Sequence, residues 1–449
     1  MKLNATNTAI LKRLLAGRNS RPLRAILSRL EAADIASLFG TLNRRDSLLL
    51  VEALASIDKA RDVFCELPDP QLRQVLAQMP SEKLLNLVVY SPDDQSAYFL
   101  THLEDSVREE VLQKLEAPKR SKIQQFLNYP AQSAGRLMET QVFSIPVTWT
   151  AAQGLDFLRQ RAQEQSIYYI YCIDEEQRLV GTLSLRALAT APAERRLFEM
   201  VKKEVVSVSP ETTDQEVAKI VAHYDFVAIP VVDKDGRLLG VITVDDVVDI
   251  IQDMATANLY AQAGLQKSDR VFTPALESIG NRLPWMFVNL ALAGLASSVV
   301  SLFEDTMSHL IVLATLKNVV AGLGGNTAIQ SLTVVTRGLA TGDFSFISHA
   351  RAIAKEVTVG VTLGLVTGIT AGVMTYIWKQ DLLVAIVIFL SMVLNALVAS
   401  VVGASVPLAL HYFGKDPATG SGVLCTMITD IFGFFSFLGI ASLGLSLIS

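Results

Sequence analysis

The 449-residue sequence predicts a multi-domain membrane protein with an all-α superhelical N-terminal domain, an α/β tandem pair, a connecting helix and a five-helix transmembrane domain. Three observations predict it: an uneven distribution of charge, a central internal repeat and a series of long apolar runs. Residues 1–270 carry 68 charged side chains, whereas residues 271–449 carry only 15. A water-soluble fold needs a more polar surface than the second part provides, which excludes a wholly soluble enzyme.

Composition excludes further classes of protein. The formal net charge is −5, with 39 Lys and Arg against 44 Asp and Glu, so the chain lacks the basic excess that binding to nucleic-acid phosphates requires. The 3 cysteines form no CxxC pair, which predicts neither a disulfide framework nor a zinc site and is typical of a reducing cytoplasm. Lys12, Arg13 and Arg18 interrupt the apolar positions near the start, so no signal peptide is expected there.

Residues 1–130 are expected to form a cytoplasmic helical domain. Segments such as LEAADIASLFGTL and LEDSVREEVLQKL place apolar residues three and four positions apart, which is the period of an amphipathic helix. Prolines between these segments mark helix boundaries. A weak repeat with a shift of 36 residues suggests stacked helical hairpins, although so few matches also arise by chance.

An internal repeat with a shift of 59 residues organises the next part, residues 131–253. IYCID at 170–174 aligns with IPVVD at 229–233, and RLVGTLSLR at 178–186 aligns with RLLGVITVD at 237–245. Each copy is predicted to contain a strand, a turn, a strand and a helix. The repeat resembles a tandem pair of CBS domains.

The resemblance to CBS domains implies a nucleotide site in the second copy. Thr243 and Asp246 form the Thr-x-x-Asp pattern that hydrogen-bonds a ribose in such modules, with ATP as the candidate ligand, whereas the first copy has Ala187 in place of the acid. The alternative is that Thr243 and Asp246 only cap the helix that follows.

Residues 271–449 are expected to cross the membrane five times. The run at 284–303 has twenty uncharged residues, enough to span a hydrocarbon core of about 30 Å at about 1.5 Å per residue. Further apolar runs cover 310–336, 357–378, 382–412 and 421–448.

Loop charges predict the orientation of these spans. Positive residues precede the first span and lie between spans two and three and between spans four and five, whereas the opposite loops carry little besides Lys379. The positive-inside rule therefore predicts a cytoplasmic N-terminus and an external C-terminus. The cations that decide this are Lys267, Arg270, Arg282, Arg337, Arg351, Lys355 and Lys415.

The order of these parts and several short motifs resemble the MgtE family of magnesium transporters along essentially the whole chain. The motifs are YPAQSAGRLM, VDDVVDII, RLPW at 282–285, AGLGGN at 321–326, VPL at 406–408 and DPA at 416–418. The resemblance implies a multi-pass homodimeric channel in the cell inner membrane, which conducts Mg²⁺ and is gated by intracellular magnesium. It also implies that residues 245–270 form a connecting helix that acts as a plug.

Asp430 is the principal candidate for the ion pathway because it lies deep in the last apolar run. A lone carboxylate in hydrocarbon is costly and usually lines a pathway or pairs with a cation. Mg²⁺ prefers oxygen ligands and keeps its bound water, so Asp430 and the amide oxygen of Asn326 suit it. Gly324 and Gly325 permit close backbone approach, although they also suit simple helix packing. By resemblance, the backbone carbonyl of Thr426 lines the ion site.

Acidic residues in the soluble part are candidates for regulatory magnesium sites. Facing carboxylates repel each other, so an ion that bridges them favours a compact closed state. An ordinary solvated acidic surface is the alternative. The candidate acids of the soluble part are Asp93, Asp94, Asp225, Asp245, Asp246, Asp249 and Asp253, and Asp416, in the loop between the fourth and fifth predicted spans, is a further candidate.

The chain departs from the family pattern at several positions that bear on gating and selectivity. Met254, Ala257 and Asn258 stand where the connecting helix of the family is acidic, and Asn318, Val423 and Met427 replace common pore residues. Lys317 would oppose cation passage if it faced the pore, so Lys317→Ala is expected to change flux; it alternatively pairs with Asp430, Glu304 or Asp305.

Two alternatives to a magnesium channel stay open. One is a membrane-anchored CBS sensor without conductance, and the other is a transporter of another divalent cation such as cobalt or manganese. No GxxxxGK[ST] motif of an ATPase occurs, so passive flux driven by the membrane potential is expected.

Overall fold

The computed structural model describes residues 5–16, 20–161, 167–266, 269, 271 and 273–448. Arg18, Lys267 and Arg270, which the sequence analysis used, lie outside the described residues. The chain divides into two units, residues 1–251 and 252–449, and each is described by itself.

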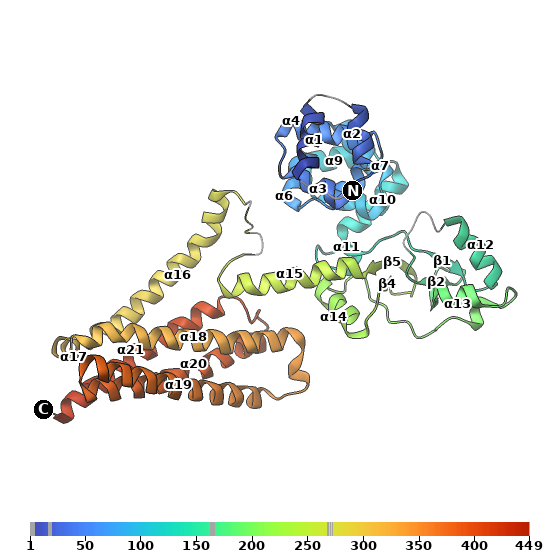
Figure 1. Ribbon diagram of the computed structural model, residues 1–449. Helices are drawn as coiled ribbons and strands as arrows, with labels where there is room; N and C mark the ends of the chain where they lie inside the picture. Colours follow the sequence, from blue (N-terminus) through green and yellow to red (C-terminus); the bar gives the residue numbers. More distant parts are fainter. Residues whose placement is uncertain are drawn as a thin grey trace. The chain divides into compact units, whose positions relative to one another are not determined.

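The first part of unit 1 is helical, as predicted, and Figure 1 shows its short helices gathered around one another. Proline fixes the backbone at several helix starts, because Pro68, Pro80 and Pro92 are the N-cap residues of α6, α7 and α8. Buried leucine and phenylalanine side chains, among them Leu72 and Phe99, form the interior. The helices are α1 Ala5–Ala16, α2 Ser20–Leu27, α3 Ala32–Phe39, α4 Arg44–Ala55, α5 Ala60–Cys65, α6 Asp69–Leu76, α7 Ser81–Tyr90, α8 Asp93–Thr101, α9 Asp105–Lys114 and α10 Ala117–Asn128.

The second part of unit 1 contains two small sheets. Strand β2 pairs in parallel with β1 and antiparallel with β3, and β4 pairs antiparallel with β5. The strands are β1 Ser144–Pro146, β2 Ile170–Ile173, β3 Leu179–Leu183, β4 Ala228–Val232 and β5 Leu238–Thr243. The helices are α11 Ala134–Leu137, α12 Ala151–Arg161, α13 Leu185–Thr190, the short 3-10 helix η1 Leu197–Glu199 and α14 Asp214–Tyr224.

The two copies of the repeat have matching local structure. Gly181 in β3 and Gly240 in β5 each face a backbone segment so closely that a Cβ would lie 2.7 Å from a carbonyl oxygen, that of Lys202 or Glu139. The backbone amide of Thr182, next to Gly181, donates to the carbonyl of Lys202. In the same way, the amide of Val241, next to Gly240, donates to the carbonyl of Glu139. The glycines therefore recur because each strand must admit a closely paired backbone segment beside it.

Unit 2 consists of the end of α15 and a set of long helices. Helix α15, Val244–Gln262, begins directly after β5 and ends before the predicted limit at residue 270. The other helices are α16 Ala275–Ser301, α17 Glu304–His309, α18 Val312–Thr341, the 3-10 helix η2 Asp343–Ser345, α19 His349–Lys379, α20 Leu382–Tyr412 and α21 Ser421–Ile448.

Figure 1 shows α18, α19, α20 and α21 side by side, with α16 leaning away from them, and α16 packs against α21. A ridge of glycines at every fourth position of α19 brings this helix against α20. A Cβ at Gly364 would lie 2.7 Å from the Cβ of Ala396, and one at Gly372 would lie 3.1 Å from the carbonyl oxygen of Ala385. Small residues allow such close approach between helices in a membrane, where lipid removes the hydrophobic drive for association.

Within the described part of the chain, four helices are long and apolar enough to cross a membrane: α16, α19, α20 and α21. This confirms a multi-domain protein with several apolar spans. The predicted second span, α18, has 30 residues but is not among the four. Its polar content sets it apart, since it carries Lys317, Asn318, Asn326, Gln330 and Arg337. A five-span arrangement therefore stays a prediction.

Candidate functional site

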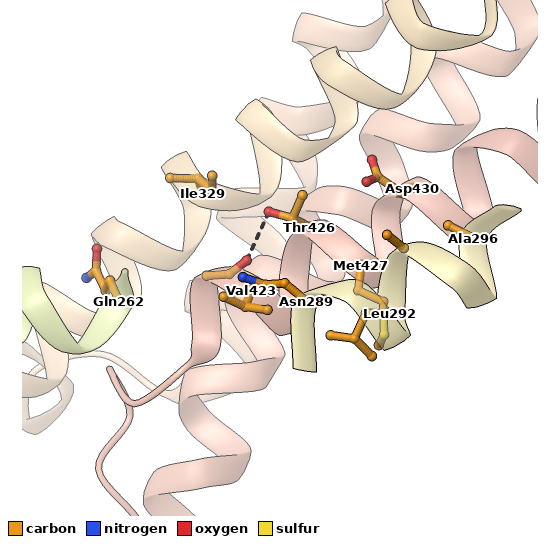
Figure 2. Close-up of a pocket in the computed structure, with 11 residues that line it drawn as sticks. Gln262, Asn289, Leu292, Ala296, Ile329, Val423, Thr426, Met427 and Asp430 are labelled. Atoms are coloured by element: carbon orange, nitrogen blue, oxygen red, sulfur yellow. Dashed lines mark hydrogen bonds between the residues drawn. The ribbon is translucent and has the colours of Figure 1, made fainter. Parts of the chain in front are cut away.

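A cavity of about 350 Å³ lies between α16, α18 and α21, with the end of α15 at its edge (Figure 2). Asp430 is the charged residue among those that line it, and Thr426 and Met427 precede it on the same helix. Helix α16 contributes Asn289, and α15 contributes Gln262. The cavity thus joins one carboxylate and two amides to an otherwise largely apolar wall, formed by Leu292, Ala293, Ala296, Ile329, Gly422, Val423 and Met427.

Asp430 and Thr426 reach the cavity because they lie four residues apart on α21, one turn of the helix. The Thr426 hydroxyl donates to the carbonyl of Gly422 at 2.9 Å, the bond drawn in Figure 2. The Thr426 carbonyl, a predicted ion ligand, accepts a bond from the Thr429 hydroxyl at 2.9 Å. Because Thr426 lies inside α21, the same carbonyl also accepts the backbone amide of Asp430 in the helical ladder, so both of its lone pairs already have partners.

The other predicted pathway residues lie on α18 near the same level of α21. A Cβ at Gly325 would lie 3.7 Å from Cγ2 of Thr426 and 3.9 Å from the hydroxyl of Thr429. Gly324 is covered by the side chain of Asn395 from α20. Asn326, which follows Gly325, is exposed in the single chain and is not among the residues that line the cavity.

Lys317 is half-buried, and its ammonium lies 5.1 Å from the ring centroid of Phe434 on α21. This cation–π contact gives the charge of Lys317 a favourable partner. In the part of the chain that is described, no carboxylate lies within ion-pair distance of Lys317, so neither Asp430 nor Glu304 nor Asp305 is its partner. Lys317 is not a lining residue of the cavity.

The last turn of α15 is attached to the first turn of α21. The backbone amide of Gly420 donates to the carbonyl of Ala261 at 3.0 Å, and a Cβ at Gly422 would lie 2.7 Å from the carbonyl oxygen of Gln262. The Trp285 ring packs against Gly264 and Gly420, two glycines with positive φ. These contacts hold Gln262 at the edge of the cavity.

Four carboxylates from separate segments of unit 1 form an acidic cluster: Asp94 of α8, Glu139 and, at the start of α15, Asp245 and Asp246. The Thr140 hydroxyl donates to Asp94 at 2.8 Å and ties the segment before β1 to α8. Glu139 interacts electrostatically with both Asp94 and Asp245. The structure therefore brings three predicted acids together through Glu139, which the sequence analysis did not select.

The pKa values within the acidic cluster are raised. Burial, and then the charges of Asp245 and Glu139, raise the pKa of Asp246 to about 7. Burial and the neighbouring Asp94 and Asp245 raise the pKa of Glu139. Burial also raises the pKa of Asp94, although the Thr140 hydrogen bond acts in the opposite direction. Among the described residues, no group of three or more acids, His or Cys is close enough to form a ready metal site.

The remaining candidate acids lie apart from the acidic cluster or at its edge. Asp93 faces Lys122 at 3.6 Å and Lys119 at 3.9 Å. Asp225 is the left-handed C-cap of α14, with φ of 55°. Asp416 accepts from the amide of Ala418 and the hydroxyl of Thr419 in the turn before α21. Asp249 and Asp253 are exposed on α15. On the same helix, Met254, Ala257 and Asn258 are half-buried. The regulatory role of these acids stays a prediction.

Thr243 and Asp246, the predicted nucleotide pair, contact each other. The buried Thr243 hydroxyl donates to the Asp246 carboxylate at 3.2 Å, at the junction of β5 and α15. In the first copy, the equivalent Ser184 instead caps α13 by accepting from the amide of Ala187 at 3.1 Å. In the second copy the hydroxyl therefore contacts a carboxylate, and in the first copy, where Ala187 replaces the acid, it caps the helix.

Sequence reasoning missed Gln262, Asn289 and Asn395 besides Glu139. Asn289 and Asn395 each stand as a lone amide inside an apolar run, and that pattern was a usable signal. Gln262 and Glu139 lie in polar surroundings in the sequence, and only the fold assigns them a place.

Comparison with known families agrees with this architecture. Residues 30–132 match the MgtE intracellular N domain, residues 134–194 and 197–253 match CBS domains, and residues 318–440 match the divalent cation transporter family MgtE. The magnesium transporter MgtE of Thermus thermophilus is 35% identical over 69% of this chain and 69% of its own length. The transporter of Bacillus subtilis is 32% identical over 70% of each chain.

The chain belongs to the MgtE family. Two solved structures of the soluble part resemble this chain as well. The soluble part of a magnesium transporter has a TM-score of 0.52 at 28% identity and covers 55% of this chain and 98% of its own. The cytosolic domain of the Mg²⁺ channel MgtE in complex with ATP has a TM-score of 0.51 at 32% identity and covers 54% of this chain and 99% of its own.

Proposed function

We propose that this protein carries Mg²⁺ across the cell membrane through its C-terminal helices and that its N-terminal and CBS domains regulate the flux. The observation that carries the proposal is the cavity between α16, α18 and α21, where Asp430 is the charged lining residue. Membership of the MgtE family, whose relatives are named magnesium transporters, supports Mg²⁺ as the substrate.

Mg²⁺ suits this cavity in its hydrated form. The ion dehydrates reluctantly, and its bound waters donate hydrogen bonds to oxygen acceptors. The Asp430 carboxylate and the amide oxygen of Asn289 are acceptors of this kind. An inside-negative potential drives a divalent ion inward with about 4.6 kcal/mol per 100 mV, so passive flux needs no coupled energy source.

We further propose a homodimer with cytoplasmic N-termini and external C-termini. Helix α16 exposes large apolar side chains such as Phe287 and Leu290 along most of its length, which suits contact with lipid or with a second copy. Two Asp430 side chains near a dimer axis supply charge for a divalent ion without removing its water. The positive residues Arg337, near the end of α18, and Arg351 and Lys355, in the first two turns of α19, support the orientation.

The acidic cluster is the proposed sensor of intracellular magnesium. Its carboxylates repel one another and have raised pKa values, so a divalent ion that binds among them relieves the repulsion and favours the compact state. Because the ion binds only that state, its concentration shifts the equilibrium by mass action.

The second CBS copy is a proposed ATP site. The Thr243 hydroxyl and Asp246 carboxylate lie 3.2 Å apart, where both can face a ribose. The structural relative of the cytosolic part contains ATP. Binding of ATP to the purified chain, lost in Asp246→Ala and retained in Asp225→Ala, tests this assignment.

Ion flux into liposomes tests the main proposal. The full-length protein is expected to conduct Mg²⁺ down its gradient, with less flux when internal Mg²⁺ is raised. Asp430→Asn removes the charge and is expected to lower flux by about tenfold or more, whereas Asp381→Asn at the α20 N-cap serves as a matched carboxylate control. A folded wild-type protein that carries no divalent ion would favour the non-conducting sensor. Stronger flux of cobalt or manganese in competition would identify another substrate.

A further inference from the structure

Asn395 lies in the middle of α20 where this helix meets both α18 and α21. Its side chain is 1% exposed, and its amide nitrogen donates to the carbonyl of Val320 on α18 at 2.9 Å. The residue belongs to neither the cavity nor the acidic cluster. It is a polar group in the most apolar helix of the protein, and such groups in membrane helices usually serve a function.

The Asn395 amide fills a notch made by two glycines on different helices. A Cβ at Gly433 of α21 would lie 2.8 Å from Nδ2 and 3.2 Å from Cγ of Asn395. A Cβ at Gly324 of α18 would collide with the same nitrogen and would lie 2.8 Å from Cγ. The side chain therefore acts as a spacer between α18 and α21, and both helices need glycine to accept it.

Packing alone does not explain why this spacer is polar. Among the described residues, no donor reaches Oδ1 of Asn395, although the atom is buried. A buried acceptor without a partner costs free energy, and a leucine, which has the same branched arrangement of side-chain heavy atoms, would avoid this cost. Residues that break a local rule in this way tend to occur at functional sites.

The two glycines of the Asn395 notch lie within one helical turn of the candidate ligands. Gly324 lies two residues before Asn326 on α18, and Gly433 lies three residues after Asp430 on α21. At the same level, Gly325 faces Thr426 and Thr429 of α21. The width of the Asn395 side chain therefore sets the separation of the helices that carry these ligands.

We propose that Asn395 is a positioning residue that sets the ion selectivity of the pathway by fixing the distance between α18 and α21 beside Asn326 and Asp430. This inference rests on the proposed transport function. Mg²⁺ and Ca²⁺ differ in size and in the rigidity of their coordination, so a small change in the distance between the ligand-bearing helices alters the preference between them. Displacements of about 1 Å at a site can change rates by about a hundredfold.

The test is the ratio of Mg²⁺ to Ca²⁺ flux in liposomes that contain the full-length protein, measured together with its melting temperature in detergent. Asn395→Leu has a bulkier apolar tip, so it is expected to hold Gly324 and Gly433 further apart. The Mg²⁺ to Ca²⁺ ratio should fall by about tenfold, while the melting temperature stays close to that of the wild type because the unpartnered acceptor is gone.

Ser391→Ala is the matched control. Ser391 is also buried on α20, one turn before Asn395, but its hydroxyl donates only to the carbonyl of Val387 in its own helix at 2.7 Å. This variant is expected to keep the wild-type flux ratio. An equal loss of selectivity in Ser391→Ala would overturn the proposal, because it would show that general packing of α20 is responsible.

A second pair of variants keeps the proposal testable if Asn395→Leu does not fold. Gly324→Ala places a methyl group in the space of the amide and is expected to reduce the yield of folded protein. Adding Asn395→Ala vacates that space, so the double variant should fold and should show an altered flux ratio. A folded Asn395 variant with the wild-type ratio overturns this proposal alone, whereas a wild-type protein without flux overturns the proposed function as well.

Discussion

The hydroxyl of Thr140 donates a 2.8 Å hydrogen bond to the carboxylate of Asp94 and so fastens the segment before β1 to helix α8. This bond joins parts of the chain that the sequence assigns to different domains. It also holds Asp94 next to Glu139, and thus helps to assemble the acidic cluster.

We expect Thr140→Val to weaken the attachment of α8 to this segment. The substitution keeps the shape of the side chain but removes a hydrogen bond to a carboxylate, a loss worth about 1.5–3 kcal/mol. Limited proteolysis of the purified protein should be faster in the variant. Thr148→Val, just after β1 and exposed, serves as the control, and equal proteolysis of both variants would argue against the role of the bond.

Stability without divalent ions should fall as the pH rises toward 7. The pKa of Asp246 rises from 3.8 to about 7 in the folded state, so the folded state holds the proton more tightly than the unfolded state does. The resulting stabilisation is complete below pH 3.8 and is lost as the pH rises through about 7. Melting temperatures between pH 5 and 8 test this expectation, with the pH range chosen to bracket the folded-state pKa.

Asp246→Asn supplies the comparison for this pH dependence. The amide does not titrate, so the melting temperature of the variant should not show the wild-type decrease as the pH rises through about 7. Added Mg²⁺ should raise the melting temperature of the wild type more at pH 8 than at pH 5, because protons compete with the ion for the carboxylates. Parallel pH curves for both proteins would contradict the raised pKa.

The equivalent turns of the two CBS copies predict opposite effects of two substitutions. Gln177 has φ of 66° in the first copy, and Gly236 has φ of 80° at the equivalent place in the second. A left-handed backbone costs a side-chain-bearing residue about 1–2 kcal/mol, so Gln177→Gly should stabilise slightly and Gly236→Ala should destabilise by about 1 kcal/mol. A Cβ at Gly236 meets no atom within 4 Å, so the backbone alone causes the effect. Chemical denaturation measures both, and unchanged stability in Gly236→Ala would contradict the argument.

The glycine ridge of α19 should tolerate no added methyl group at its centre. A Cβ at Gly364 would lie 2.7 Å from that of Ala396 on α20, and such overpacking costs about 1–3 kcal/mol. Gly364→Ala is therefore expected to lower the melting temperature in detergent. At Gly294 and Gly322 a Cβ meets nothing within 4 Å, so alanine there should raise helix stability by up to about 1 kcal/mol. Equal effects at Gly364 and Gly294 would contradict this packing.

Much of the architecture follows from local pattern in the sequence. The helical period, the prolines at helix starts and the 59-residue repeat predicted the helical domain and the CBS pair, because these signals act within one element. Asp430 was equally predictable, since a carboxylate in an apolar run stands out. The status of α18 is harder to predict, because Asn318, Asn326, Gln330 and Arg337 are exposed on it in the single chain and, in the described part of the chain, only Lys317 has a partner, the Phe434 ring, which the sequence does not display.

Residues far apart in sequence determine the rest of the site. Glu139 joins the acidic cluster only because the Gly240 strand admits its segment. Asn395 depends on glycines from two other helices, and Gln262 reaches the cavity through contacts with Gly420 and Gly422. The positions of these side chains depend on tertiary packing, which the periodicity of a single sequence does not encode.

The bond between Gly420 and Ala261 has a mechanical consequence for the chain. Helix α15 grows directly out of strand β5, and its far end is bonded to the first residue before α21, the helix that carries Asp430. A displacement of this end of α15 is therefore expected to move the start of α21 as well, because the Gly420–Ala261 bond, the contact of Gly422 with Gln262 and the Trp285 ring join the two. At this junction Gly264 and Gly420, both with left-handed backbones, leave room for the Trp285 ring that packs against them.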